Sequence, residues 1–136
     1  MKKIKYLVQK NCTVTVIDNL STGNRNAVKS SNFIQGDLAD QELLEEVFSK
    51  ARYDAVFHFA AFSQVGESVR NPLKYFRNNI SNTINLLNVM DEANVHHLVY
   101  SSSAAVYGHP VKDSISESDP LNPVNPYGLS KLVVEK

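Results

Sequence analysis

Short runs of β-branched and aromatic residues alternate along this chain with longer stretches of helical periodicity, and this alternation constrains the fold more than any other feature. The runs that predict strands span residues 13–18, 32–37, 54–61 and 97–103. The third run, DAVFHFAA, is almost continuously apolar, which is typical of a strand buried on both faces of a parallel sheet. The pattern therefore predicts a parallel sheet with helices above and below it.

Three stretches of the sequence predict helices. Residues 40–50 carry Asp40 at the expected N-cap, followed by an apolar stripe along one helical face. Residues 72–94 open with Pro72, which a first helical turn tolerates, and place apolar residues at spacings of three or four. The last helix begins near Pro126. This order of elements implies an α/β, partial doubly wound parallel-sheet fold in one domain that spans residues 1–136.

Composition limits the classes of partner. The chain has 136 residues with fourteen basic and fourteen acidic side chains, so no net field attracts nucleic acid or an anionic membrane. The single Cys12 cannot form an internal disulfide, and no apolar stretch has the length of a membrane span. The short, interrupted apolar part of MKKIKYLVQKN does not match a signal peptide. We therefore expect a cytoplasmic protein that binds neither nucleic acid nor a membrane.

Ligands of doubly wound sheets bind outside the carboxyl ends of the strands. Four polar stretches follow the expected strands and contain Asp18, Asp37, residues 60–64 and residues 101–103. We expect these stretches to converge on one edge of the sheet. The loop of residues 108–125 is long for a simple connection, which favours a functional role for it.

Asp18 stands where a dinucleotide-binding fold places a carboxylate that accepts hydrogen bonds from the adenosine ribose, an arrangement that favours NAD over NADP. The surrounding DNLSTGN is rich in turn formers, so a strand-ending turn is the alternative interpretation. Asp37 in QGDL has the same two interpretations, as a contact to the adenine or as a turn residue.

Tyr127 and Lys131 are four residues apart, so their side chains share one face of the last helix. A phenol is a poor base at neutral pH, but a nearby ammonium stabilises the phenolate and makes it a usable proton acceptor. Ser103, at the end of its strand, could share that proton. The alternatives are an ordinary surface pair for Tyr127 and Lys131, and strand-end hydrogen bonding for the serines.

Several motifs, taken as a set, resemble the extended short-chain dehydrogenase/reductase family. They are Asp18 after its strand, HFAAFSQVGES, YFRNNISNT, SSSAAVYG and NPYGLSK, in that order and at these separations. The resemblance covers nearly the whole chain and implies a Rossmann-like domain that binds NAD. It further implies an enzyme of galactose metabolism that epimerises a UDP-hexose at C4 through a 4-keto sugar, with a UDP-sugar as its substrate.

The resemblance also implies roles for individual residues. Tyr127 would be the catalytic acid and base, Lys131 would bind the nicotinamide ribose, and Ser103 would hydrogen-bond the reacting sugar hydroxyl. The positions implied to line the NAD site are Asp18, Asn19, Asp37, Leu38, Phe59, Ala60, Ala61, Ser63, Asn78, Tyr127 and Lys131. The family often pairs through two helices, so a homodimer through residues 72–94 and the last helix is a possible assembly.

Two further features refine the expected activity. Dehydratases of the family carry an acid pair after the position of Ser103, and Ala104 and Ala105 stand there instead, which favours epimerisation over loss of water. The histidines show no ligand spacing, so no metal site is expected at His58, His96, His97 or His109.

The family begins with a strand, a glycine-rich turn that binds the pyrophosphate, and a helix, whereas the first glycine of this chain is Gly23. MKKI resembles the start of that first strand, joined directly to KYLVQKN as the end of the first helix. We therefore expect a fragment that also lacks the C-terminal substrate lobe, and whose own activity is impaired. A non-catalytic remnant or interaction fragment is the alternative.

Overall fold

A computed structural model of the chain describes residues 2–28, 32–110 and 113–136. Its α-helices are α1 (Lys2–Gln9), α2 (Gln41–Lys50), α3 (Val65–Arg70), α4 (Pro72–Phe76), α5 (Asn82–Glu92) and α6 (Pro126–Glu135). Its strands are β1 (Thr15–Asp18), β2 (Asn32–Gln35), β3 (Val56–His58) and β4 (Leu98–Tyr100). Two short 3-10 helices, η1 (Arg25–Ala27) and η3 (Ala104–Tyr107), and a π-helix, η2 (Arg77–Ser81), complete the elements. None of the described helices is long and apolar enough to cross a membrane.

The strands form two parallel pairs rather than one continuous sheet. β1 pairs with β2, with Thr15 opposite Asn32, and β3 pairs with β4, with Val56 opposite Leu98. Parallel pairing in both pairs, with a helical crossover from β3 to β4, confirms the expected α/β class and a partial Rossmann-like arrangement. The expectation of a single sheet is wrong for the described residues, because no strand pairing joins β1 to β3.

The first residues form a helix and not the beginning of a strand. The expectation that MKKI starts a strand is wrong, because α1 runs without a break from Lys2 to Gln9. Lysine, leucine and glutamine are good helix formers, and Ile4, Leu7 and Val8 follow the spacing of one helical face. The helix ends at Gln9, and Asn11 in the following turn has a φ of 60°, the left-handed conformation that asparagine tolerates.

Residues 72–92 are helical throughout, as expected, but a π-helix interrupts the α-helix in the middle of this segment. Pro72 occupies the first turn of α4, where its missing N–H costs nothing. The helix then widens into η2 over Arg77–Ser81 before it continues as α5. A π-helical turn inside an α-helix is rare and is frequent at functional sites. The π-helix contains Asn78, one of the expected site residues.

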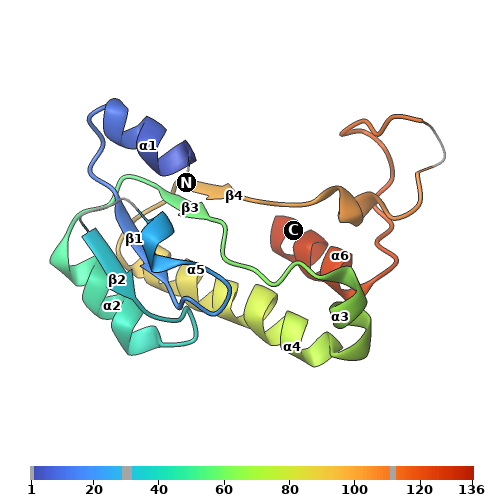
Figure 1. The fold of residues 1–136 in the computed structure, drawn as a ribbon, viewed down its shortest axis with the longest axis horizontal. Coiled ribbons are helices and arrows are strands. Elements are labelled where there is room, and N and C mark those ends of the chain that lie inside the picture. The colour runs from blue at the N-terminus through green and yellow to red at the C-terminus, as the bar shows by residue number, and fades with distance from the viewer. Residues whose placement is uncertain (1, 29–31, 111–112) are drawn as a thin grey trace.

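α5 and α2 pack together on one side of the strands, and α1 lies on the other side of them (Figure 1). The main apolar cluster consists of Leu86, Met90 and Val95, against which Phe48 of α2 and Val56 of β3 pack. Asp40 caps α2 as expected, since its carboxylate accepts a hydrogen bond from the N–H of Leu43 at 3.0 Å. Burial of this shared α2–α5 face holds the strands on their helices.

The opposite face of the β3–β4 pair is only partly covered. Phe57 and Val99, which lie opposite each other in the register, are 43% and 46% exposed. The expectation that residues 54–61 are buried on both faces is therefore wrong for Phe57. An unbroken apolar run indicates which residues can be buried, but the elements packed on each side decide which of them are.

The long loop of residues 108–125 closes on itself before α6 begins. The N–H of Asn122 donates to the carbonyl of Val106 at 3.0 Å, which brings the two ends of the loop together. Gly108 has a φ of +69°, and a Cβ there would lie 2.0 Å from the Asn122 oxygen, so only glycine fits. The closed loop returns the chain to η3, against which α6 packs.

Candidate active site

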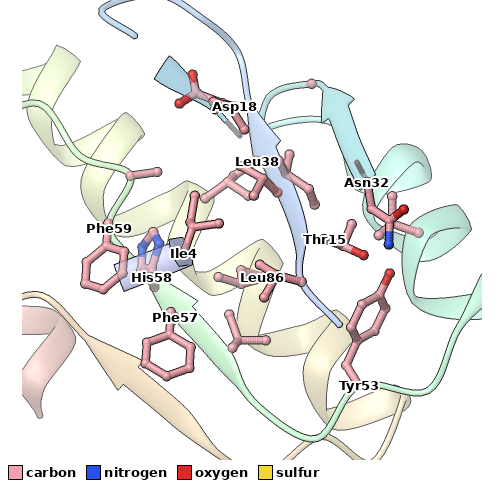
Figure 2. Close-up of a pocket in the computed structure, with 18 of the residues that line it drawn as sticks. Ile4, Thr15, Asp18, Asn32, Leu38, Tyr53, Phe57, His58, Phe59 and Leu86 are labelled. Atoms are coloured by element: carbon pink, nitrogen blue, oxygen red, sulfur yellow. The ribbon is translucent and has the colours of Figure 1, made fainter. Parts of the chain in front are cut away.

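A cavity of about 1070 Å³ lies between the two strand pairs and extends to the residues at the carboxyl ends of β1 and β3. Figure 2 shows Asp18 and Phe59 toward one end of it and Tyr53 toward the other. The expected cofactor positions that line the cavity are Asp18, Asn19, Asp37, Leu38, Phe59, Ala60, Ala61 and Asn78. Three of the four expected stretches, those with Asp18, Asp37 and residues 60–64, therefore contribute to this cavity, whereas residues 101–103 do not line it.

The Asp18 carboxylate is held by its own turn. Its Oδ1 accepts a hydrogen bond from the N–H of Leu20 at 2.7 Å, and Leu20 has a φ of 58°. A Cβ on Gly23 would lie 3.1 Å from both carboxylate oxygens, so a glycine there leaves room for the carboxylate. Oδ2 has no hydrogen bond to a described residue. Asp18 thus makes the turn contact of the alternative interpretation and keeps one oxygen for a further donor.

Asn19 and Asp37 form a bridge between the ends of β1 and β2. The Asn19 amide donates to Asp37 Oδ2 at 2.6 Å, and Asp37 Oδ1 accepts from the N–H of Ala39 at 2.9 Å. Asn82 of α5 donates to the same oxygen at 3.3 Å. Asn82 is not among the residues predicted from the sequence, although asparagine is unfavourable within a helix and its presence there indicates a polar contact.

Lys131 is buried, at 4% exposure, and its ammonium donates to the carbonyl of Ser101 at 2.8 Å. The same Nζ lies 4.8 Å from the centroid of the Tyr100 ring. Burial lowers the pKa of the Lys131 ammonium, because the charged form loses hydration. The last helix is therefore fixed to the residue that follows β4, at the carboxyl end of that strand. Because the Lys131 ammonium is buried and hydrogen-bonded, Tyr127 and Lys131 do not form the ordinary surface pair of the alternative interpretation.

Tyr127 is fixed by its backbone and by a ring contact. The Ser130 hydroxyl donates to the Tyr127 carbonyl at 2.7 Å and accepts from the Asn79 amide at 3.0 Å. The Tyr127 ring meets the ring of Tyr75 edge-on, with centroids 6.5 Å apart. Tyr75 is fully buried, and its hydroxyl lies 2.9 Å from a carboxylate oxygen of Glu67.

Asn79 connects three parts of the site and is 1% exposed. Besides its bond to Ser130, its amide donates to the carbonyl of Phe62 at 3.0 Å, and its Oδ1 accepts from the N–H of Phe62 at 2.9 Å. The same oxygen accepts from the amide of Asn78 at 2.9 Å. Sequence reasoning missed Asn79, although two adjacent asparagines within an otherwise apolar helical period are a signal that could have found it.

Ser103 begins a segment that packs closely against the last helix at Gly128. Its hydroxyl accepts from the N–H of Ala105 at 3.2 Å and caps η3. A Cβ on Gly128 would lie 2.5 Å from the Ala105 carbonyl oxygen, so the backbones of α6 and η3 touch at this point. Gly128 follows Tyr127 directly in the sequence. The contact places the turn that carries Tyr127 against the segment that begins at Ser103.

A buried histidine and a buried phenol lie beside Lys131. His58 is 4% exposed and shares a hydrogen bond of 2.8 Å with the Thr83 hydroxyl. Burial, and next the charge of Lys131, lower the pKa of His58 to about 4. Burial, followed by the charges of Glu135 and Tyr127, raises the pKa of Tyr100 to about 12. The Tyr100 hydroxyl has no hydrogen-bond partner among the described residues.

These groups suit parts of a dinucleotide cofactor. The remaining Asp18 oxygen is an acceptor for ribose hydroxyls, and the Lys131 ammonium has donors beyond its bond to Ser101. A glycine-rich turn is the usual binder of a pyrophosphate, and residues 2–14, which form α1 and a short turn, contain no glycine. The acceptor at Asp18 and the donor at Lys131 therefore suit ribose hydroxyls rather than phosphates.

Four expected residues lie outside the cavity lining. Tyr127 and Lys131 belong to α6, and Ser103 belongs to the segment after β4. Ser63 is exposed and does not line the cavity either. Within the described residues, no three His, Cys, Asp or Glu side chains are placed to hold a metal ion.

Comparison with known proteins gives a consistent set of relatives. A UDP-glucose 4-epimerase of Lactobacillus helveticus is 49% identical over 134 residues, which are 98% of this chain and 41% of the relative. The UDP-glucose 4-epimerase of Brucella ovis, solved in complex with NAD, is 44% identical with a TM-score of 0.93, over 96% of this chain and 40% of that one.

Another similar protein is named for a different UDP-sugar. A putative UDP-arabinose 4-epimerase of Arabidopsis thaliana is 44% identical over 95% of this chain and 32% of its own length. The chain thus spans about 40% of the length of its bacterial relatives. The NAD dependent epimerase/dehydratase family matches residues 3–136, almost the entire sequence. The chain belongs to the NAD dependent epimerase/dehydratase family.

Proposed function

We propose that this chain carries the cofactor-binding part and the proton-transfer residues of a UDP-hexose 4-epimerase that interconverts UDP-glucose and UDP-galactose. The observation that carries the proposal is the tether of Lys131 to Ser101, at 2.8 Å, one helical turn from Tyr127. The tether keeps an ammonium at the carboxyl edge to which Asp18 also belongs. Relatives named as UDP-glucose 4-epimerases align with nearly the whole of this chain, and the chain matches the NAD dependent epimerase/dehydratase family.

Tyr127 is the proposed acid and base. Its phenolate would remove the proton of the sugar 4-hydroxyl, and the phenol would return it to the 4-keto sugar on reversal. Lys131, one helical turn further along α6, would supply a positive charge on the same helical face. Ser103 is the proposed partner of the reacting hydroxyl. General acid and base assistance of this kind contributes about 10² to 10⁴ in rate.

Asp18 would hold the adenosine ribose of NAD, and Lys131 its nicotinamide ribose. When bound, NAD supplies the hydride acceptor and donor that a reversible oxidation at C4 needs. Ala104 and Ala105 form the start of η3 beside Ser103, so no carboxylate of this segment can protonate a leaving hydroxyl. This absence favours epimerisation over elimination, and the substrate is the UDP-sugar named for several relatives.

The second candidate is a non-catalytic interaction fragment. It is favoured by residues 2–14, which form α1 and a short turn and contain no glycine for a phosphate-binding turn. The two candidates differ in NAD binding by the chain on its own. An interaction fragment needs no affinity for NAD, whereas the cofactor-binding part of an epimerase retains some.

The test is NAD binding by ligand-observed NMR, which detects millimolar affinity. We expect saturation transfer to the adenosine protons with this chain, and a loss of at least about tenfold in affinity, about 1.4 kcal/mol, for Asp18→Asn. Asparagine keeps the acceptor for the N–H of Leu20 but loses the charge. Glu42→Gln, an exposed carboxylate of α2, serves as the control. Equal affinity of Asp18→Asn would contradict the role of Asp18, and no transfer at all would favour the interaction fragment.

A further inference from the structure

The Lys131 ammonium is buried without a carboxylate beside it. Lys131 is 4% exposed, and its Nζ forms no ion pair with a described residue. Glu135, the acidic residue of α6, instead accepts a hydrogen bond from the Ser102 hydroxyl. Glu67 of α3, a helix that packs on α6, pairs with Lys74 of α4. Because a buried ammonium is costly unless other groups replace its water, its partners must be sought among uncharged groups.

A backbone carbonyl and an aromatic ring meet this ammonium. The Ser101 carbonyl accepts a hydrogen bond from Lys131 Nζ at 2.8 Å, and the centroid of the Tyr100 ring lies 4.8 Å from the same atom. A cation within about 6 Å of an aromatic centroid is attracted by the negative face of the ring, and more strongly where water is excluded. One carbonyl and one ring face therefore hold the charge.

His58, a second neighbour of the Tyr100 ring, is uncharged. The centroids of the two rings are 5.6 Å apart. The Thr83 hydroxyl donates its only proton to the Asn79 carbonyl at 2.8 Å, so it accepts from His58 Nε2 in their 2.8 Å hydrogen bond. Burial, followed by the charge of Lys131, lowers the pKa of His58 to about 4. Of these two neighbours of the ring, Lys131 alone is charged near neutral pH.

We propose that Tyr100 is a positioning residue for Lys131, whose side chain the face of the Tyr100 ring keeps charged and fixed at the carboxyl end of β4, one helical turn from Tyr127. Burial, followed by the charges of Glu135 and Tyr127, raises the pKa of Tyr100 to about 12, so its hydroxyl stays protonated near neutral pH. That hydroxyl has no partner among the described residues, so the ring face is what acts on Lys131. Only the use of the held ammonium in proton transfer rests on the proposed function.

The titration of Lys131 tests the proposal in the whole chain, without any ligand. The ε-carbon and ε-proton signals of the lysines are followed by NMR as the pH is raised, and Lys131→Arg identifies the signal of Lys131. Loss of the ring face disfavours the charged form, so the midpoint for Lys131 should fall by about 0.4 to 1.5 pH units in Tyr100→Leu. Tyr100→Phe keeps the ring face and should stay within about 0.3 pH units of the unchanged chain.

The direction of the change separates positioning from packing. If leucine merely loosened the core, water would reach the ammonium and the midpoint would rise. A rise in Tyr100→Leu, or equal midpoints in Tyr100→Leu and Tyr100→Phe, would overturn the proposal. Tyr6→Leu is the control, because it removes an exposed ring that lies 5.8 Å from the ammonium of Lys10. It should leave the midpoint of Lys131 unchanged.

A second readout serves if Tyr100→Leu does not fold. Protons above the face of an aromatic ring resonate upfield, so the ε-protons of Lys131 in the unchanged chain should lie upfield of those of Lys50, an exposed lysine of α2. Equal positions of the two signals in the folded chain would contradict the ring contact. Because no NAD is present, a chain that shows the expected titration but does not bind NAD loses the proposed function alone.

Discussion

The ammonium of Lys131 donates a hydrogen bond of 2.8 Å to the carbonyl of Ser101, a residue that lies thirty positions earlier and directly follows β4. This bond fixes α6 at the carboxyl edge of the β3–β4 pair. The Tyr127 carbonyl is fixed by Ser130, and the adjacent Gly128 touches the backbone of η3. The geometry of the proposed proton transfer therefore depends on how closely α6 can approach η3.

Gly128→Ala tests that approach. Alanine normally stabilises a helix by about 1 kcal/mol relative to glycine, but here its Cβ would lie 2.5 Å from a carbonyl oxygen. We expect the free energy of unfolding in urea to fall by about 1–3 kcal/mol, because the backbone must shift. Gly66→Ala in α3, where the nearest atom is 3.9 Å away, is the matched control and should be neutral or stabilising. If both variants gain stability, the close contact is absent.

His58 predicts a pH dependence of stability. Its pKa is about 4 in the folded chain and near 6.5 when unfolded, so the unfolded state binds the extra proton between these values. The free energy of unfolding is therefore highest above pH 6.5 and should fall by about 2 kcal/mol between pH 7 and pH 5. Urea titrations at both pH values measure the difference. His58→Gln lacks the titrating ring and should show a much smaller difference; an equal difference would assign the effect to other groups.

Asn79→Ala should be among the most destabilising polar substitutions in the chain. It leaves the N–H and carbonyl of Phe62 without their partner, and each unsatisfied buried group costs about 1–3 kcal/mol. We expect a loss of about 2–4 kcal/mol in urea unfolding. The control is Asn88→Ala, an exposed position of α5, for which a change within about 0.5 kcal/mol is expected. A similar small loss at Asn79 would mean that water replaces the amide.

Much of the fold follows from local pattern, and the exceptions have physical causes. The α2 cap at Asp40 and the start of α4 at Pro72 were predictable because capping and proline chemistry act within one turn. For α1, the resemblance suggested a strand start, but the spacing of Ile4, Leu7 and Val8 matches the observed helix. Tertiary context alone decides that Phe57 is exposed on one face.

The candidate site also combines residues that local pattern predicts with residues that only tertiary contacts reveal. Asp18 and Asp37 could be placed at the cavity because they stand at or just after strand ends, and the carboxyl ends of parallel strands meet at one edge, whereas Asn19 was expected only from the resemblance. Asn79, Ser130 and Gly128 were not predictable, because their importance lies in contacts with segments that are distant in sequence. The π-helix at η2 was likewise not visible, since apolar spacing alone does not distinguish it from an α-helix.

Turnover of UDP-galactose by a chimera tests the central claim most directly. Residues 13–136 of this chain would replace the corresponding part of the Lactobacillus helveticus relative, which is 49% identical to it. We predict that the chimera forms UDP-glucose, and that Tyr127→Phe lowers kcat by at least about 10² while NAD affinity stays within about twofold. An active chimera whose Tyr127→Phe variant has an unchanged kcat would contradict the claim that Tyr127 transfers the proton.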